Sequence, residues 1–198
     1  MTKILRLIGL TTVGCTSLLF AVGCSTTSIF SDPRDERSAQ TTPLSIVATH
    51  HLGDDYSIDD VFVNGQWGGD ASRGGGGGGY VCCVLLPSVW RPGLVARVKW
   101  RVRDWRHENK DETKVGIQRS IVDEGIYVAT VPVERYSQLG SLYVHFFPGA
   151  KVRVVASMYG PFGRGHPITE SPEEHRSAVV GTRVGKKKDI KPSEPSGE

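Results

Sequence analysis

The amino-acid sequence predicts an all-β fold: a small sandwich-like domain of about seven or eight mainly antiparallel strands, with a flexible N-terminal tether and a C-terminal tail. Apolar and polar residues alternate with a period of two in several segments between residues 44 and 161, which is typical of strands with one buried face. No segment in this region combines an amphipathic helical period with helix caps. The region is about 120 residues long, which fits one domain.

The strongest expected strands each have a signature in the sequence. Residues 80–86 are almost wholly apolar, as in a central strand. Residues 94–103 alternate most clearly between apolar side chains and cations. Residues 142–147 and 152–158 flank Pro148-Gly149-Ala150 and predict a hairpin. The shorter candidate strands are residues 45–50, 61–63, 115–121 and 126–133.

The N-terminal segment has the three parts of a secretory signal. Two cations precede an uncharged apolar stretch, and a small residue lies directly before Cys24. Ala21-Val22-Gly23-Cys24 resembles the lipobox of bacterial lipoproteins, in which the cysteine is acylated before cleavage makes it the new N-terminus. We therefore expect a signal peptide over residues 1–23 and lipidation of Cys24. An ordinary signal or a short anchor helix is the alternative.

Removal of this signal leaves a chain without a strong net charge. The sequence holds 24 Lys+Arg against 21 Asp+Glu, and two of the cations, Lys3 and Arg6, lie in the signal. A nucleic-acid partner is therefore not expected. Lipoprotein modification supplies the several acyl chains that stable membrane attachment requires. By resemblance to Gram-negative lipoproteins, Ser25 after the cysteine implies attachment to the outer membrane, with the body of the protein in the periplasm.

Two flanking regions lack the apolar residues needed for a packed core. Residues 24–43 are rich in Ser, Thr, Asp and Arg, and we interpret them as a tether. Residues 162–198 contain several prolines and a run of three lysines. We expect a disordered, solvated tail, although Ala178-Val179-Val180 is apolar enough to dock. A role of the lysines at an anionic membrane surface is the alternative to a solvated tail.

The glycine run at residues 74–79 satisfies the letters of a dinucleotide-binding motif. Such a loop needs a following helix whose N-terminal amides face the phosphate, whereas a strand is expected after this run. We interpret it as a flexible or closely packed loop between strands, with a backbone-mediated binding loop as the alternative. No cofactor is predicted.

The reactive side chains form no recognisable catalytic or metal site. The histidines lack a zinc-binding spacing, and the four aspartates between residues 54 and 60 lack the spacing of a calcium loop. Cys82 and Cys83 are adjacent in an apolar strand, so we expect buried thiols, with a disulfide between them as the less favoured alternative. No catalytic residue, metal ligand or enzymatic activity is predicted.

The face formed by Arg97, Lys99, Arg101 and Arg103 is the strongest candidate for a binding site. Alternate residues of a strand lie about 6–7 Å apart on one side, so the cations form a charged row. A solvated face is the ordinary interpretation, and a docking surface for an acidic protein partner is the functional one. Trp67, at the start of the glycine-rich loop, is the next candidate contact.

Several short motifs follow one another in a characteristic order between residues 44 and 160. They are Val61-Phe62-Val63-Asn64-Gly65-Gln66-Trp67-Gly68-Gly69, Val81-Cys82-Cys83, Leu86-Pro87, Trp90-Arg91-Pro92-Gly93-Leu94, Val98-Lys99-Trp100 and Val144-His145-Phe146. Together they resemble the bacterial lipoprotein family catalogued as domain of unknown function 3304. In setting, its members resemble the Tli3-like immunity lipoproteins encoded beside antibacterial lipase effectors of type VI secretion systems. The resemblance implies a periplasmic protein that binds and neutralises a phospholipase toxin, and it implies no catalytic residues.

Two other functions stay open from the sequence. One is a structural or assembly lipoprotein that binds another component of the cell envelope, and the other is a hydrolase with an unrecognised site. A neighbouring lipase gene would favour the immunity protein, and an unrelated envelope operon would favour the structural lipoprotein.

Overall fold

The computed structural model describes residues 40–76, 79–106, 111, 114–115, 122–169 and 177–185, all within one compact unit. The expected signal peptide, the lipidation site Cys24 and nearly all of the expected tether lie outside the described residues, as does most of the candidate strand 115–121. No helix within the described ranges is long and apolar enough to cross a membrane.

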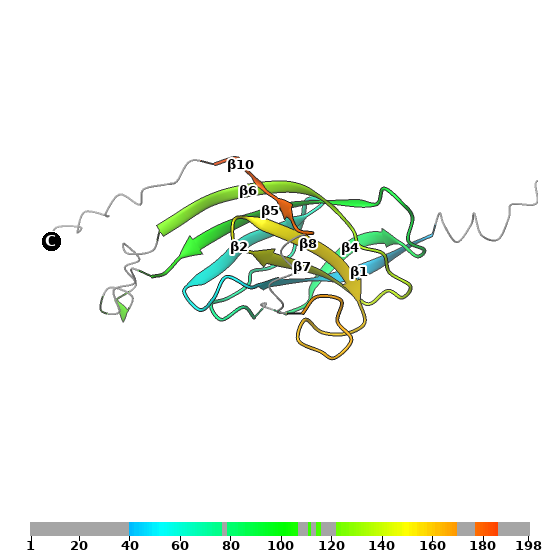
Figure 1. The fold of residues 1–198 in the computed structure, drawn as a ribbon, viewed down its shortest axis with the longest axis horizontal. Coiled ribbons are helices and arrows are strands. Elements are labelled where there is room, and N and C mark those ends of the chain that lie inside the picture. The colour runs from blue at the N-terminus through cyan, green and yellow to red at the C-terminus, as the bar shows by residue number, and fades with distance from the viewer. Residues whose placement is uncertain are drawn as a thin grey trace, which may run out of the picture. The chain divides into compact units, whose positions relative to one another are not determined.

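Two five-stranded sheets pack face to face (Figure 1). Sheet A has the strand order β4-β1-β7-β8-β9, and sheet B has the order β10-β6-β5-β2-β3. The predicted all-β sandwich is confirmed, with ten strands among the described residues instead of seven or eight. The strands are β1 (Thr41–His50), β2 (Tyr56–Val63), β3 (Gln66–Trp67), β4 (Val81–Pro87), β5 (Val95–Asp104), β6 (Val122–Pro132), β7 (Ser141–Phe147), β8 (Lys151–Ser157), β9 (Val179–Val180) and β10 (Thr182–Arg183).

Neighbouring strands are antiparallel, except for the parallel pair β1 and β7. The predicted hairpin is confirmed as β7–β8, which are paired from Ser141–Ser157 to Phe147–Lys151. Its turn contains Gly149 and Ala150, whose φ angles of 77° and 56° belong to the left-handed region. Such angles suit a tight hairpin because they match the twist of the flanking strands.

The main core lies between the two sheets. The strand β5 points every second side chain into this core, from Ala96 to Val102. Trp100 is 1% exposed, and its ring lies 5.7 Å from that of Tyr127 in sheet B and 5.3 Å from that of Phe146 in sheet A. One large indole therefore joins both layers of the sandwich.

The chain crosses from one sheet to the other at Gly181, which separates β9 at the edge of sheet A from β10 at the edge of sheet B. A Cβ atom at Gly181 would collide with the ring of Trp100. Only a glycine lets the backbone pass this close to the indole. The ordered fold thus extends beyond the expected domain boundary at residue 161. The apolar segment around Val179 docks on the edge of sheet A as β9.

A second, smaller cluster covers the outer face of sheet A. Val47, Tyr143, Phe147 and Val155 point outward from this sheet and pack against Ile168. We call residues 158–169 the covering segment. Residues 162–169 of this segment lie beyond the expected boundary, so the start of the expected tail is structured.

Candidate functional site

The alternation predicted for β5 is confirmed, and it places four cations on the outer face of sheet B. Arg97 and Lys99 are exposed, whereas Arg101 and Arg103 are half-buried. The side chains between them point into the core. The four positions therefore share a face but differ in how much charge they offer to a partner.

Two of the four cations are paired with aspartates of the neighbouring strand β2. Arg101 donates from Nε to the carboxylate of Asp60 at 2.9 Å, and Arg103 forms an ion pair with Asp59. Burial raises the pKa of the Asp59 carboxyl, and Arg103 opposes this shift. Among the described residues, no carboxylate is paired with Arg97 or Lys99. The four cations thus differ in charge balance, since carboxylates of β2 neutralise Arg101 and Arg103.

A row of paired residues crosses the whole of sheet B. Trp67 lies opposite Phe62, Phe62 opposite Lys99, Lys99 opposite Val128, and Val128 opposite Thr182. Residues that lie opposite each other in neighbouring strands point to the same side of a sheet. We call these five residues the cross-sheet row. It brings together two separately predicted contacts, Trp67 and Lys99.

The β2–β3 turn fixes the position of Trp67. Asn64 and Gly65 have φ angles of 52° and 85°, as in the two-residue Asn-Gly hairpin turn. The side-chain oxygen of Asn64 accepts a bond from the backbone nitrogen of Arg97 at 2.8 Å, and its backbone nitrogen donates to the Arg97 carbonyl at 2.8 Å. The turn is therefore tied to β5. An Asn-Gly pair is itself a sequence signal for such a hairpin, although the strand that follows it is not among those expected from the sequence.

A shallow hollow of about 600 Å³ lies beside the cross-sheet row. Trp67 is 52% exposed, which is high for an indole. The hollow thus combines apolar surface, two cations and a side-chain amide, which suits non-covalent binding of a protein surface. Its lining residues are Phe62, Asn64, Gly65, Arg97, Lys99 and Val128.

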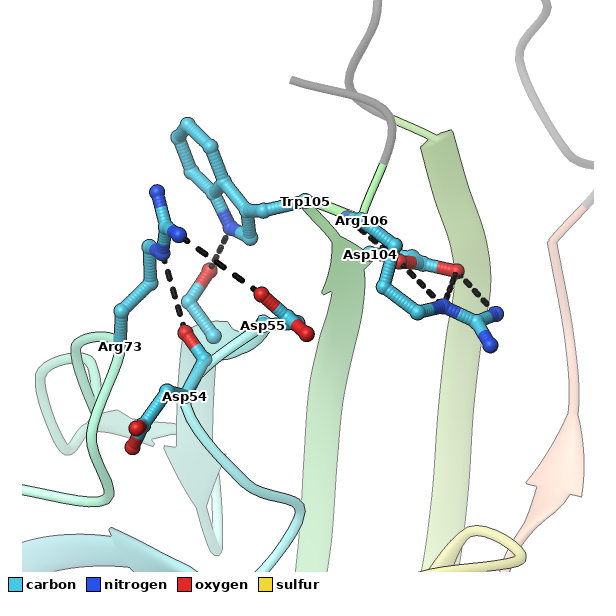
Figure 2. A network of polar contacts seen from close by, with 7 residues as sticks. Asp54, Asp55, Arg73, Asp104, Trp105 and Arg106 are labelled. Atoms are coloured by element: carbon cyan, nitrogen blue, oxygen red, sulfur yellow. Dashed lines mark hydrogen bonds and ion pairs between the residues drawn. The ribbon is translucent and has the colours of Figure 1, made fainter.

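The glycine-rich loop after Trp67 is held in place by polar contacts (Figure 2). Arg73 donates from Nε to the Asp54 carbonyl at 3.0 Å, forms an ion pair with Asp55, and lies 5.5 Å from the ring centre of Trp105. A Cβ atom at Gly75 would lie 2.7 Å from the carbonyl oxygen of His50. Gly75 is thus closely packed, whereas a Cβ atom at Gly76 or Gly79 would meet nothing within 4 Å, and the strand β4 follows the run.

The cysteine expectation is wrong. Cys82 and Cys83 are joined by a disulfide, with a cis peptide bond between them. Cys82 is exposed and Cys83 is half-buried, because β4 is an edge strand of sheet A. The apolar sequence of this segment suggests a central strand with buried side chains. The expectation of two buried thiols fails because β4 lies at the edge of the sheet.

Three histidines far apart in the sequence form a hydrogen-bonded chain, which sequence reasoning missed. His51 Nε2 lies 2.9 Å from His145 Nδ1, and His145 Nε2 lies 3.0 Å from His166 Nε2. His166 Nδ1 lies 2.9 Å from the carbonyl oxygen of Tyr159. Burial, together with the two neighbouring histidines and Arg153, holds the pKa of His145 well below its usual value. We call these residues the histidine chain; it joins sheet A to the covering segment.

The described residues contain no group of three or more His, Cys, Asp or Glu side chains placed to hold a metal ion. Most of the aspartates between residues 54 and 60 have ordinary structural partners. Asp59 and Asp60 pair with β5, and Asp55 pairs with Arg73. The chemistry that the described surface offers is therefore recognition through charge, aromatic area and hydrogen bonds.

Comparison with known families places these features in context. The model of a family described as "Protein of unknown function (DUF3304)" matches residues 53–154, just over half of the chain. The chain belongs to this family. The matched region of this DUF3304 protein includes four members of the cross-sheet row, from Phe62 to Val128. Searches among curated proteins and among solved structures found no match.

Proposed function

We propose that this DUF3304 protein is a lipid-anchored periplasmic binding protein that neutralises an antibacterial phospholipase toxin of a type VI secretion system by occluding it. The observation that carries the proposal is the cross-sheet row, in which an exposed indole and an unpaired cation share one face. Trp and Arg are enriched among the residues that contribute most to protein–protein binding. Trp67, in this row, and Arg97, which lines the adjoining hollow on the same face, are the proposed anchors of the interface.

The charge of this face favours an acidic partner. Arg97 and Lys99 flank the hollow, whereas the pairs Arg101–Asp60 and Arg103–Asp59 contribute little net charge beside them. Complementary charge mainly increases the association rate. We therefore assign to Lys99 a role in attracting the toxin and to Trp67 a role in retaining it.

Anchoring through Cys24 is part of the same proposal. Acyl chains on an N-terminal cysteine would hold the domain at the periplasmic side of the outer membrane. A phospholipase toxin acts on lipids of the cell envelope, so an anchored inhibitor would stay beside the surface that the toxin attacks. The support for this step is the lipobox-like sequence that ends at Cys24 and the resemblance to immunity lipoproteins.

The test uses a phospholipase effector of a type VI secretion system, taken from the gene neighbourhood of this protein if one is encoded there. Hydrolysis of phospholipid vesicles by that enzyme is measured while the purified protein is titrated in. We expect inhibition that is complete near one molecule per toxin molecule, and much weaker inhibition by Trp67→Ala or Lys99→Glu. Arg164→Glu is the matched control, because it reverses an exposed charge on the covering segment, away from sheet B.

Full lipase activity in the presence of excess wild-type protein would overturn the proposal. If the protein instead binds an envelope component and no lipase, it is a structural or assembly lipoprotein. If all three variants inhibit as strongly as the wild type, the immunity function is supported but the cross-sheet row is not its binding site.

A further inference from the structure

A cavity of about 500 Å³ opens at one end of the sandwich, between the two sheets. Its floor contains buried side chains from both sheets, among them Ile58, Trp100 and Phe146. Its mouth lies beside the β7–β8 turn at Gly149. We call it the end cavity. It is distinct from the hollow on the outer face of sheet B, because the two share no lining residue.

The wall of the end cavity is more apolar than polar and is rich in aromatic rings. Leu52 and Val102 complete the apolar part, and Tyr56 and Tyr127 add two further rings. A cavity of a few hundred Å³ with such a lining and only a few polar groups is the usual form of a small-molecule site. The volume corresponds to about 16 water-sized groups at roughly 30 Å³ each. This is enough for one acyl chain and too small for the two chains of a phospholipid.

The charged groups at the mouth decide which polar end such a chain can carry. Within the described part of the chain, Arg106 and Glu124 are the charged residues of the lining. The guanidinium of Arg106 is bound by both carboxylate oxygens of Asp104, and it lies 5.4 Å from the ring centre of Tyr56. Its charge is therefore balanced within the protein (Figure 2). Glu124 supplies the remaining charge, which is negative.

We propose that the end cavity binds one acyl chain of an amphiphile whose polar end is uncharged or cationic. The chain lies against Trp100 and Phe146, and the polar end stays at the mouth beside Glu124. The Glu124 carboxylate attracts a cationic end and repels an anionic one. This inference goes beyond the proposed toxin binding and does not depend on it.

The test compares three amphiphiles with the same alkyl chain and different polar ends: decanol, decyltrimethylammonium and decanoate. Binding to the purified protein is measured by calorimetry below the micelle concentration of each compound. We expect decanol and decyltrimethylammonium to bind, and decanoate to bind at least about tenfold more weakly, since the Glu124 carboxylate repels a second anion at the mouth. Bound ligand should also raise the unfolding midpoint, whereas detergent denaturation would lower it.

Two variants test whether the end cavity is the site. Val102→Phe fills the cavity from β5 and should abolish binding of decanol. If that variant does not fold, Leu52→Trp fills the cavity from the β1–β2 loop, where Leu52 is only half-buried. Val95→Phe, at an exposed position of the same strand β5, is the matched control and should bind decanol like the wild type.

A third variant tests the charge argument. Glu124→Gln should leave decanol binding unchanged and reduce the preference for decyltrimethylammonium over decanoate by about tenfold, because it removes the carboxylate that separates the two. The proposal is overturned if none of the three compounds binds, if a folded cavity-filling variant binds decanol normally, or if decanoate binds to the wild type as tightly as decyltrimethylammonium.

Discussion

The ammonium nitrogen of Lys99 lies 5.6 Å from the centre of the Phe62 ring on the neighbouring strand. A cation at this distance from an aromatic face is attracted to it. The contact holds Lys99 over the same part of sheet B on which Trp67 is exposed. Charge and aromatic area are therefore presented together.

Reversal of the Lys99 charge should slow association with an acidic toxin and weaken its dependence on salt, because long-range attraction between exposed charges is screened by ions. Lys99→Glu is compared with Arg164→Glu in surface-immobilised kinetics at low and high salt. Thermal stability should be nearly unchanged, since the side chain is exposed. An unaltered association rate and salt slope would show that Lys99 belongs to a merely solvated face.

Gly181→Ala should destabilise the fold by about 1–3 kcal/mol, the usual cost of forcing extra volume into a packed core. The added methyl group would collide with Trp100. Urea unfolding monitored by tryptophan fluorescence measures the change. Gly160→Ala is the control, because a Cβ atom there meets nothing within 4 Å. Similar stabilities of the two variants would refute the close approach at Gly181.

Stability should fall as the pH drops below about 6.5, the ordinary pKa of histidine. The Tyr159 carbonyl can only accept, so His166 Nδ1 carries hydrogen. With neutral rings, His166 Nε2 then accepts from His145, and His145 Nδ1 accepts from His51. A proton added to His145 would put two donors face to face. The folded pKa of His145 is lowered, so the unfolded state binds more protons below pH 6.5 and gains free energy relative to the folded state.

The pH effect has a defined size and a defined origin. Each histidine protonated only in the unfolded state contributes a slope of about 1.4 kcal/mol per pH unit. The pKa values of His50 and His166 are also lowered, mainly by burial, so they add to the slope. The nearby carboxylates of Glu134 and Asp54 raise the pKa of His166 and of His50, respectively, which reduces the contribution of these two histidines to the slope. His145→Phe should flatten the slope in urea unfolding from neutral to acidic pH, and an unchanged slope would contradict this account.

Reduction of the Cys82–Cys83 disulfide should change stability little. The bond joins residues one position apart, whereas the entropic stabilisation by a disulfide grows with the length of the loop that it closes. Dithiothreitol should lower the unfolding midpoint by less than about 4 °C, the shift that corresponds to roughly 1 kcal/mol in a small domain. The double variant Cys82→Ser/Cys83→Ser is the control. A much larger fall in reductant, absent from the control, would contradict the prediction.

Cys24→Ala should abolish metabolic labelling with palmitate and release the protein from the outer-membrane fraction, because acylation requires the thiol. Cys15→Ala is the matched control, and it should be labelled like the wild type. Labelling that persists in Cys24→Ala would place the anchor elsewhere.

Local sequence patterns identified the longer strands and failed where pairing partners decide the structure. In β5, the alternation from Ala96 to Asp104 is a property of one segment, so it could be read directly. The strands β3, β9 and β10 have two residues each, which is too short for any period. They exist because β2, β8 and β6 offer them backbone partners.

The site could be predicted only in part for the same reason. The four cations of β5 follow from alternation. The pairing of two of them with aspartates of β2 depends on the β2–β5 register, which shifts between Asp59 and Phe62. The alignment of Trp67 with Lys99 depends on that register as well. The histidine chain joins residues 51, 145 and 166, and nothing local to any of them indicates the other two.

The place of β1 in sheet A has a mechanical consequence if the protein is held by its N-terminus, as we propose. β1 is the first strand of the described residues, and it is paired on both sides, with β4 and with β7. A force applied through the preceding residues would act along the strand and load both ladders of hydrogen bonds in shear. An edge strand, in contrast, could be peeled away one bond at a time. The proposed anchor would thus apply its load to a strand that resists it, and unfolding would not begin where the load enters.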